Sequence, residues 1–115
     1  MDSGLTSGVR HPGLAAGRWH TLSLAEQMGN IGSEVGRARR WRDRDHGQFE
    51  SAAFRALELL ELTIRDPRWR RRLKELTRVK EIFCDEVWGS RVYQTNLEAL
   101  ERYFNVFALY ARRDK

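Results

Sequence analysis

Arginine is the residue whose chemistry stands out in this sequence of 115 residues. Lys and Arg number 21 against 16 Asp and Glu, and the formal net charge is +5. A guanidinium group can bind phosphate or carboxylate oxygens through two parallel hydrogen bonds, so clustered arginines favour polyanionic partners such as RNA or DNA. Much of the positive charge is gathered in two short segments, residues 37–44 and 65–74.

The segment 65–74 is the stronger candidate for binding a polyanion. It is expected to begin a helix, where the helix dipole disfavours positive charge, and no acidic neighbour is expected to offset it. Trp69 flanks this segment, and the basic end of the chain is expected to join it. The predicted nucleic-acid site consists of Arg68, Arg70, Arg71, Arg72, Lys74, Arg112 and Arg113. The alternative is a solvated basic face without a ligand.

The segment 37–44 is expected to be used partly for internal ion pairs. Positive charge suits the C-terminal end of a helix, and acidic residues of a later helix are expected to lie beside it. Those residues are Glu81, Asp85 and Glu86. This pairing would weaken the segment as a binding site.

Residues that could carry out catalysis are few. No Ser, His and Asp can be assembled into a triad, the Glu-x-x-His motif of di-metal bundles is absent, and the three His residues are scattered. We therefore expect no metal, no cofactor and no enzymatic activity. The single cysteine, Cys84, cannot form an internal disulfide, which fits a reducing, cytoplasmic location.

One pair of residues resembles a catalytic motif. Arg40 and His46 are separated by five residues, which is similar to the loose Arg-to-His spacing of the HEPN ribonucleases, helical bundles that cut RNA without a metal. Trp41 follows Arg40 where that family usually has a polar residue, and arginine is abundant throughout this chain. A HEPN-like ribonuclease is therefore a lesser alternative.

The apolar periodicity predicts four amphipathic helices after a flexible tail. Residues 1–20 are rich in glycine and are expected to form the tail, from which only Trp19 docks. Ser23 and Glu26 make a capping box that begins the first helix, which is expected to run to about Arg44.

The later helices are predicted from their start and stop signals. The second covers residues 48–64, and Asp66 with Pro67 ends it and begins the third. The third closes near Gly89, and Thr95 with Glu98 forms a capping box for the fourth.

These predictions describe an all-α protein. Because the links between helices are short, residues 21–115 are expected to form an antiparallel up-down-up-down four-helix bundle. No apolar run is long enough to cross a membrane, and no membrane partner is expected.

Three glycines in the first helix call for an explanation. Gly29, Gly32 and Gly36 follow no strand and precede no Lys-Ser or Lys-Thr pair, so they do not form a phosphate-binding loop. A helix turns about 100° per residue, which places them on one strip beside the apolar stripe. Each glycine costs roughly 1 kcal/mol relative to alanine, so we expect close packing of another helix to compensate. The alternative is a loosely packed helix that tolerates them.

Several large apolar residues lie off the predicted core stripes of the second and fourth helices. Contiguous exposed apolar surface usually marks an interface, so we predict a homo-oligomer with these residues at its seam. The alternative is a monomer in which they form the rim of an irregular core. The residues are Phe54, Leu62, Tyr103, Val106 and Tyr110.

Three stretches resemble a group of small bacterial four-helix proteins of unknown role. They read WHTLSLAEQMGNIGSEVGRARRW, RALELLELTIRDPRWRRRLKEL and VKEIFCDEV. More distantly, the size, topology and basic character are similar to the four-helix-bundle family that includes proteins encoded in ribosomal-RNA intervening sequences and the accessory variability determinant of diversity-generating retroelements. That resemblance implies ring-like pentamers and a basic surface that binds nucleic acid and a cognate reverse transcriptase.

The function predicted from the sequence is thus that of a non-enzymatic, oligomeric helical protein. It is expected to bind RNA, DNA or a nucleoprotein partner through a basic end. The alternative is a protein–protein interaction scaffold in which the arginines only keep the protein soluble. Affinity for nucleic acid that falls steeply with salt would distinguish the two.

Overall fold

The computed structural model describes residues 17–113, and the side chains of residues 17–109. Within this part of the chain the secondary structure is helical and contains no strand, which confirms the all-α class. The helices are α3 (Leu24–Trp41), α4 (His46–Arg65), the 3₁₀ helix η1 (Pro67–Arg72), α5 (Leu73–Trp88) and α6 (Leu97–Arg113).

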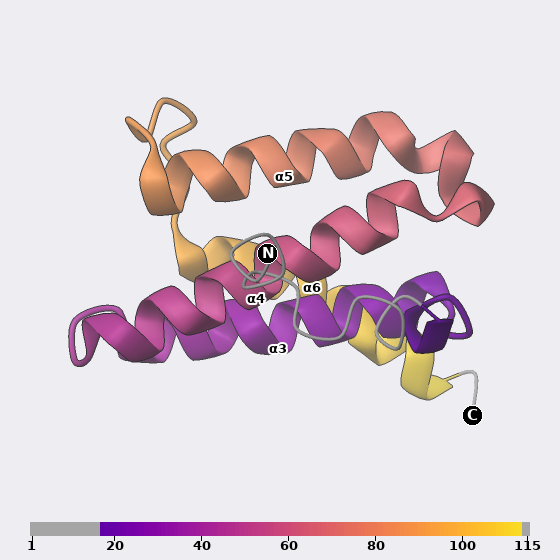
Figure 1. The fold of residues 1–115 in the computed structure, drawn as a ribbon, viewed down its shortest axis with the longest axis horizontal. Coiled ribbons are helices and arrows are strands. Elements are labelled where there is room, and N and C mark those ends of the chain that lie inside the picture. Colours follow the sequence, from indigo (N-terminus) through magenta and orange to yellow (C-terminus); the bar gives the residue numbers. More distant parts are fainter. Residues whose placement is uncertain (1–16, 114–115) are drawn as a thin grey trace, which may run out of the picture.

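Helix α3 lies between α4 and α6. It packs extensively against both α4 and α6, whereas α5 packs mainly on α4 and touches α6 only slightly. In Figure 1, α5 accordingly lies along one edge of the molecule, and the chain turns back at each link between helices. One long side of α5 is therefore left open.

The predicted start of α3 is confirmed, and its predicted end is wrong. The Ser23 hydroxyl accepts a hydrogen bond from the Glu26 backbone N–H at 3.1 Å, and the Glu26 carboxylate accepts from the Ser23 N–H at 2.9 Å. The helix ends at Trp41 rather than near Arg44, because residues 42–44 form a turn. Asp45 then caps α4 by accepting from the Gln48 N–H at 3.0 Å.

The third predicted helix is divided in two. Asp66 caps it as expected, accepting from the Arg68 N–H at 3.0 Å. The first turns, however, are the 3₁₀ helix η1, in which Trp69 has the non-helical angles φ −103° and ψ 24°. The Trp69 indole N–H donates to the Gln27 side-chain oxygen at 2.9 Å, and this contact with α3 holds Trp69 where the break occurs.

The predicted cap of α6 is one residue too early. The Asn96 side chain, rather than Thr95, accepts from the third N–H of the helix, that of Ala99, at 2.7 Å. Asn caps helices at least as well as Thr, and Asn96 is the residue directly before Leu97. Gly89 occupies the C-terminal cap of α5 as predicted, with its N–H donated to the Asp85 carbonyl at 3.0 Å.

A single apolar core lies between the helices. Trp19 is buried in it, as expected, and its indole N–H donates to the Thr63 hydroxyl at 3.0 Å. The largest fully buried apolar side chains come from all four α-helices: Phe83, Phe104, Met28, Ile31, Leu60, Leu76 and Val35.

The three glycines of α3 face α6 at close range. A Cβ atom built on Gly29 would lie 3.2 Å from Ala108 Cβ, and one built on Gly32 would lie 2.7 Å from Phe104 Cβ. One built on Gly36 would lie 2.5 Å from the carboxylate of Glu101. Residue numbers along α6 thus fall as those along α3 rise, and the missing side chains let the two helices approach.

Replacing Gly32 by alanine tests this close approach. The contact with Phe104 Cβ leaves no room for a methyl group, because Cβ atoms move only with their backbone. We expect the free energy of unfolding to fall by about 1–3 kcal/mol, as measured by urea denaturation.

Gly47→Ala is the matched control, since a Cβ there would make only an ordinary 3.4 Å contact with Asp45. It should be neutral or stabilise the protein by up to about 1 kcal/mol. Equal stability of the Gly32→Ala protein and the wild type would show that α3 and α6 are not tightly packed at this point.

Candidate nucleic-acid interface

The candidate site is built on η1 and the first half of α5. Pro67 and the Asp66 cap begin the 3₁₀ helix, and the chain passes directly from Arg72 into α5. Leu76, Val79 and Phe83 anchor α5 in the core. The opposite side of η1 and α5 is exposed.

A shallow groove of about 600 Å³ runs along this exposed side. We call it the α5 groove. Its basic lining residues form no ion pair within residues 17–109, and the acidic residue Glu81 lies at its far end. The groove is lined by Arg70, Arg71, Leu73, Lys74, Thr77, Arg78 and Glu81.

Arg78 is the binding candidate that sequence reasoning missed. It follows Lys74 by four residues on α5, a helical repeat that brings the two to one side of the helix. Arg70 joins them in the groove from η1. The four-residue spacing from Lys74 was the signal in the sequence for Arg78, whereas the density of arginine in residues 68–72 favoured η1.

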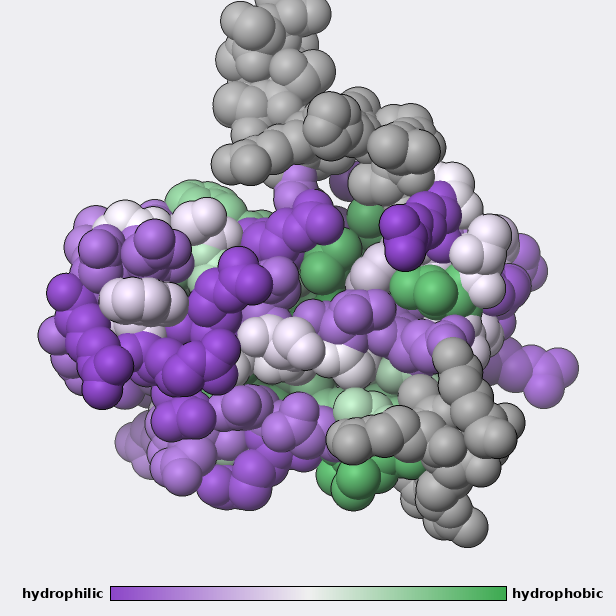
Figure 2. Space-filling model, turned by 90° about the horizontal axis from the view of Figure 1, so that it is seen from below, coloured by the Kyte–Doolittle hydropathy of each residue, from purple (hydrophilic) through white to green (hydrophobic). Residues whose placement is uncertain are grey.

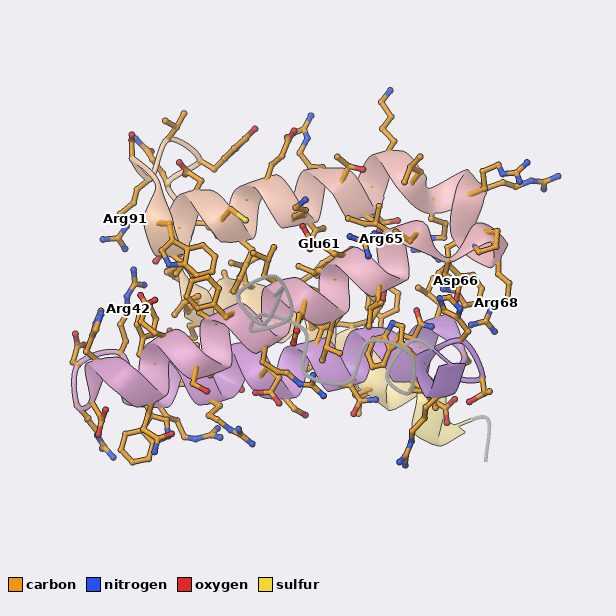
Figure 3. The ribbon with its side chains drawn as sticks, viewed as in Figure 1. Arg42, Glu61, Arg65, Asp66, Arg68 and Arg91 are labelled. Atoms are coloured by element: carbon orange, nitrogen blue, oxygen red, sulfur yellow. The ribbon has the colours of Figure 1, made fainter. Side chains whose placement is uncertain are left out.

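Arg68 lies outside the groove and is held in an ion pair. Its guanidinium donates to the Asp66 carboxylate at 2.7 Å and to the Leu22 carbonyl at 2.8 Å, and it lies over the Trp69 ring at 4.4 Å. The expectation that no acidic group would offset this cluster is therefore wrong for Arg68. Its arrangement at the end of α4 can be followed in Figure 3.

Asp66 is the centre of a buried polar network. The hydrogen bonds from Arg68, acting against burial, lower the pKa of the Asp66 carboxyl from an ordinary 3.8 to about 2. The Gln27 amide donates to Asp66 at 3.3 Å and to the Trp19 carbonyl at 2.8 Å, and its oxygen accepts from Trp69. Trp69 is thus committed to this network and does not line the groove.

Arg72 also has an acidic neighbour. It donates to the Glu75 carboxylate at 2.9 Å and lies 5.7 Å from the centre of the Phe107 ring. The Tyr103 hydroxyl donates to the other Glu75 oxygen at 2.6 Å, and this bond lowers the pKa of Glu75. Burial, together with the same bond, raises the pKa of Tyr103.

The residues of the predicted nucleic-acid site therefore fall into two groups, those in the α5 groove and those held in local ion pairs. Arg70, Arg71 and Lys74 lie together in the α5 groove, whereas Arg68 and Arg72 form local ion pairs. The side chains of Arg112 and Arg113 lie outside the described residues.

Residues 37–44 form an ion pair with one of their three predicted acidic partners, Glu86. Arg42 donates to the fully buried carboxylate of Glu86 at 2.7 Å, and Arg91 donates to the same carboxylate at 2.9 Å. Asp85 instead accepts from the backbone N–H of Tyr93 at 3.0 Å, and Glu81 lies in the α5 groove. Figure 3 shows Arg42 and Arg91 converging at the end of the molecule where α3 joins α4.

The remaining arginines of this segment differ in their partners. Arg39 pairs with Glu101 of α6 at 2.6 Å, and Arg37 lies 3.6 Å from Glu34. Arg40 and Arg44 are exposed and form no ion pair in the described part of the chain. Figure 2 shows hydrophilic residues covering this same end.

The predicted oligomer seam contains both exposed and half-buried residues. Val106 and Phe54 are exposed by 49% and 52%, and Phe54 packs against Trp88 in a tilted arrangement with 4.9 Å between ring centres. Leu62 and Tyr103 are partly buried against the core. The side chain of Tyr110 lies outside the described residues.

The described residues offer little support for other chemistry. None of their His, Cys, Asp and Glu side chains form a group that could hold a metal ion. His46 lies 3.8 Å from Glu50, and within the described residues Arg40 forms no hydrogen bond with it. No helix in the described ranges is both long enough and apolar enough to span a membrane.

Comparison of the chain with protein-family models, with curated proteins and with solved structures gives no match.

Replacing Asp66 by asparagine tests the structural role assigned to its ion pair. The folded pKa of Asp66 lies below its ordinary value, so ionised Asp66 stabilises the protein above about pH 4, and this stabilisation is lost as the pH falls toward 2. We expect Asp66→Asn to cost about 1–2 kcal/mol at pH 7 and to reduce the loss of stability between pH 4 and 2. Denaturant unfolding at several pH values measures both.

Asp43→Asn, at an exposed position in the turn after α3, is the control and should leave both quantities nearly unchanged. The structural role is refuted if Asp66→Asn matches this control across the pH range.

Proposed function

We propose that the protein is a non-enzymatic nucleic-acid-binding protein that uses the α5 groove as its contact surface. The observation that carries this proposal is the gathering of Arg70, Arg71, Lys74 and Arg78 on one exposed side of η1 and α5 without an ion-pair partner among the described residues. Arginine forks match phosphate oxygens bidentately, and lysine adds a point charge.

The pairing of the other basic residues supports this choice. Arg39, Arg42, Arg68 and Arg91 each hold a carboxylate at 3 Å or less, so their charge is already used within the fold. The groove cations keep their charge for an external anion. Placing four like charges together disfavours the free state, and a polyanion would relieve that repulsion.

The arrangement of the helices fits the same proposal. We propose that α3, α4, α5 and α6 form an antiparallel four-helix bundle, as the opposed register of α3 and α6 suggests. In such a bundle α5 would present the groove from a rigid support. A cognate reverse transcriptase, which the family resemblance implies as a partner, stays a prediction.

A pair of charge-reversal variants tests the proposed surface. Arg70→Glu with Arg71→Glu removes two predicted phosphate contacts and should weaken binding to a generic duplex on the order of 50-fold at about 0.1 M salt, since each contact contributes close to one power of the salt concentration. Filter binding across a salt series measures this loss, and circular dichroism checks that the variant is folded.

Arg40→Glu with Arg44→Glu is the matched control, because it makes the same change in net charge outside the groove, at exposed positions without an ion pair among residues 17–109. It should weaken binding far less. The proposed surface is wrong if the two variants behave alike, and the scaffold function replaces it if the wild type shows no salt-dependent affinity.

We further propose that the protein forms a homo-oligomer through α6. Val106 and Leu109 are exposed by 49% and 57% and lie three residues apart, so they present neighbouring apolar surface on one side of the helix. Tyr103, by contrast, already donates its hydroxyl to Glu75. We therefore propose that the seam lies on the outer side of α6.

Val106→Glu with Leu109→Glu should convert the oligomer to a monomer, because it places two charges in the proposed seam while leaving the buried core intact. Sedimentation velocity measures the change. Arg102→Glu is the control, since it makes the same change in net charge at an exposed position of α6. A wild type that is monomeric at micromolar concentration rules the proposed oligomer out.

A further inference from the structure

We infer that the α5 groove binds the phosphate backbone of a double helix in preference to a single strand. This inference rests on the nucleic-acid binding proposed above and adds the class of nucleic acid. It follows from the spacing of the groove cations, from the absence of a stacking surface among the described lining residues, and from the position of Glu81.

The spacing of the cations matches a regular phosphate backbone. Lys74 and Arg78 lie four residues apart on α5, a rise of about 6 Å, and Arg70 and Arg71 precede them in the 3₁₀ helix η1. One strand of a duplex carries a phosphate about every 3.4 Å along the axis, so the two cations of α5 span about two phosphates, and those of η1 extend the line beyond them. Because Leu76 and Phe83 are buried, α5 holds this spacing fixed.

The rigid line of charge favours a rigid partner. A duplex already presents its phosphates at regular intervals. A single strand would have to be ordered along α5, which costs conformational entropy. The same contacts therefore give a duplex the higher affinity.

Among the described residues, the groove lining contains no aromatic ring on which unpaired bases could stack. Proteins that bind single strands obtain much of their affinity from such stacking. Trp69, the nearest aromatic residue in sequence, is partly buried, donates its N–H to Gln27 and has the Arg68 guanidinium over its ring. A single strand would thus find charge in this groove but no stacking surface.

The lining offers several donors to phosphates and a limited choice of base contacts. Its cations and the Thr77 hydroxyl can donate to phosphate oxygens. Among the described residues it contains no Asn or Gln, the side chains that pair with adenine, although its arginines can also pair with guanine. Glu81 closes the line of cations after Arg78, where its carboxylate would repel a further phosphate. We therefore expect a short contact with little dependence on sequence.

Fluorescence anisotropy with labelled duplexes of about 20 base pairs, one of DNA and one of RNA, and with their separate strands, tests this inference on the full chain. We expect each duplex to bind at least about tenfold more tightly than its strands at about 0.1 M salt, with log K falling with log salt at a slope of about −3 to −4. Duplexes of unrelated sequence should agree within about twofold. The inference is supported if either the DNA or the RNA duplex binds more tightly than its own strands. The duplex with the higher affinity is then the preferred kind.

Glu81→Gln adds a readout specific to the groove. Removing its repulsion should raise duplex affinity several-fold, whereas Glu98→Gln, which makes the same charge change at an exposed position of α6, should not. Tighter binding of the single strands, or equal effects of the two variants, would overturn the inference while leaving nucleic-acid binding in place. Binding to neither form would overturn the proposed function itself.

Discussion

The close approach of α3 and α6 is the constraint on which the rest of the structure depends. Gly32 allows it, because a Cβ atom there would lie 2.7 Å from Phe104 Cβ. Helix α6 packs against one side of α3 and α4 packs against another. Helix α5 therefore packs mainly on α4, at the edge of the molecule. The exposed side of α5, and with it the groove, is a consequence of this packing.

The basic residues then differ in role according to their carboxylate partners. At one end, the Asp66 carboxylate accepts from Arg68 and Gln27, and the Gln27 oxygen accepts from Trp69, which ties α3 to η1. At the other, the buried Glu86 joins Arg42 of the turn after α3 to Arg91 in the loop before α6. Arg91 has φ 60°, a conformation that costs a residue with a side chain some energy, and its ion pair with Glu86 offsets that cost. These pairs hold the helix ends together, and within the described part of the chain the groove cations are left without an ion-pair partner.

Features that depend on neighbours in sequence could be predicted well. Ser23 and Glu26 cap α3 because they are three residues apart, and the glycine strip follows from the helical repeat alone. The break at Trp69 could not be found in this way, because its hydrogen-bond partner, Gln27, is 42 residues away.

The division of the basic residues was only partly predictable. The Arg68–Asp66 pair spans two residues and was within reach of sequence reasoning, as was the four-residue repeat that leads to Arg78. The pairing of Arg39 with Glu101, 62 residues away, required the tertiary packing of α3 against α6. Which arginines remain available to a ligand is therefore decided by the fold more than by their clustering in the sequence.

The central claim is that a polyanion contacts the protein along the outer side of η1 and α5. The most direct measurement is a titration of isotope-labelled protein with a short duplex, followed by two-dimensional NMR of the backbone amides. The largest shift changes are expected at residues 70–81 and should reverse when salt is added. Changes centred on Arg40 and Arg44, or no changes at all, would contradict the claim.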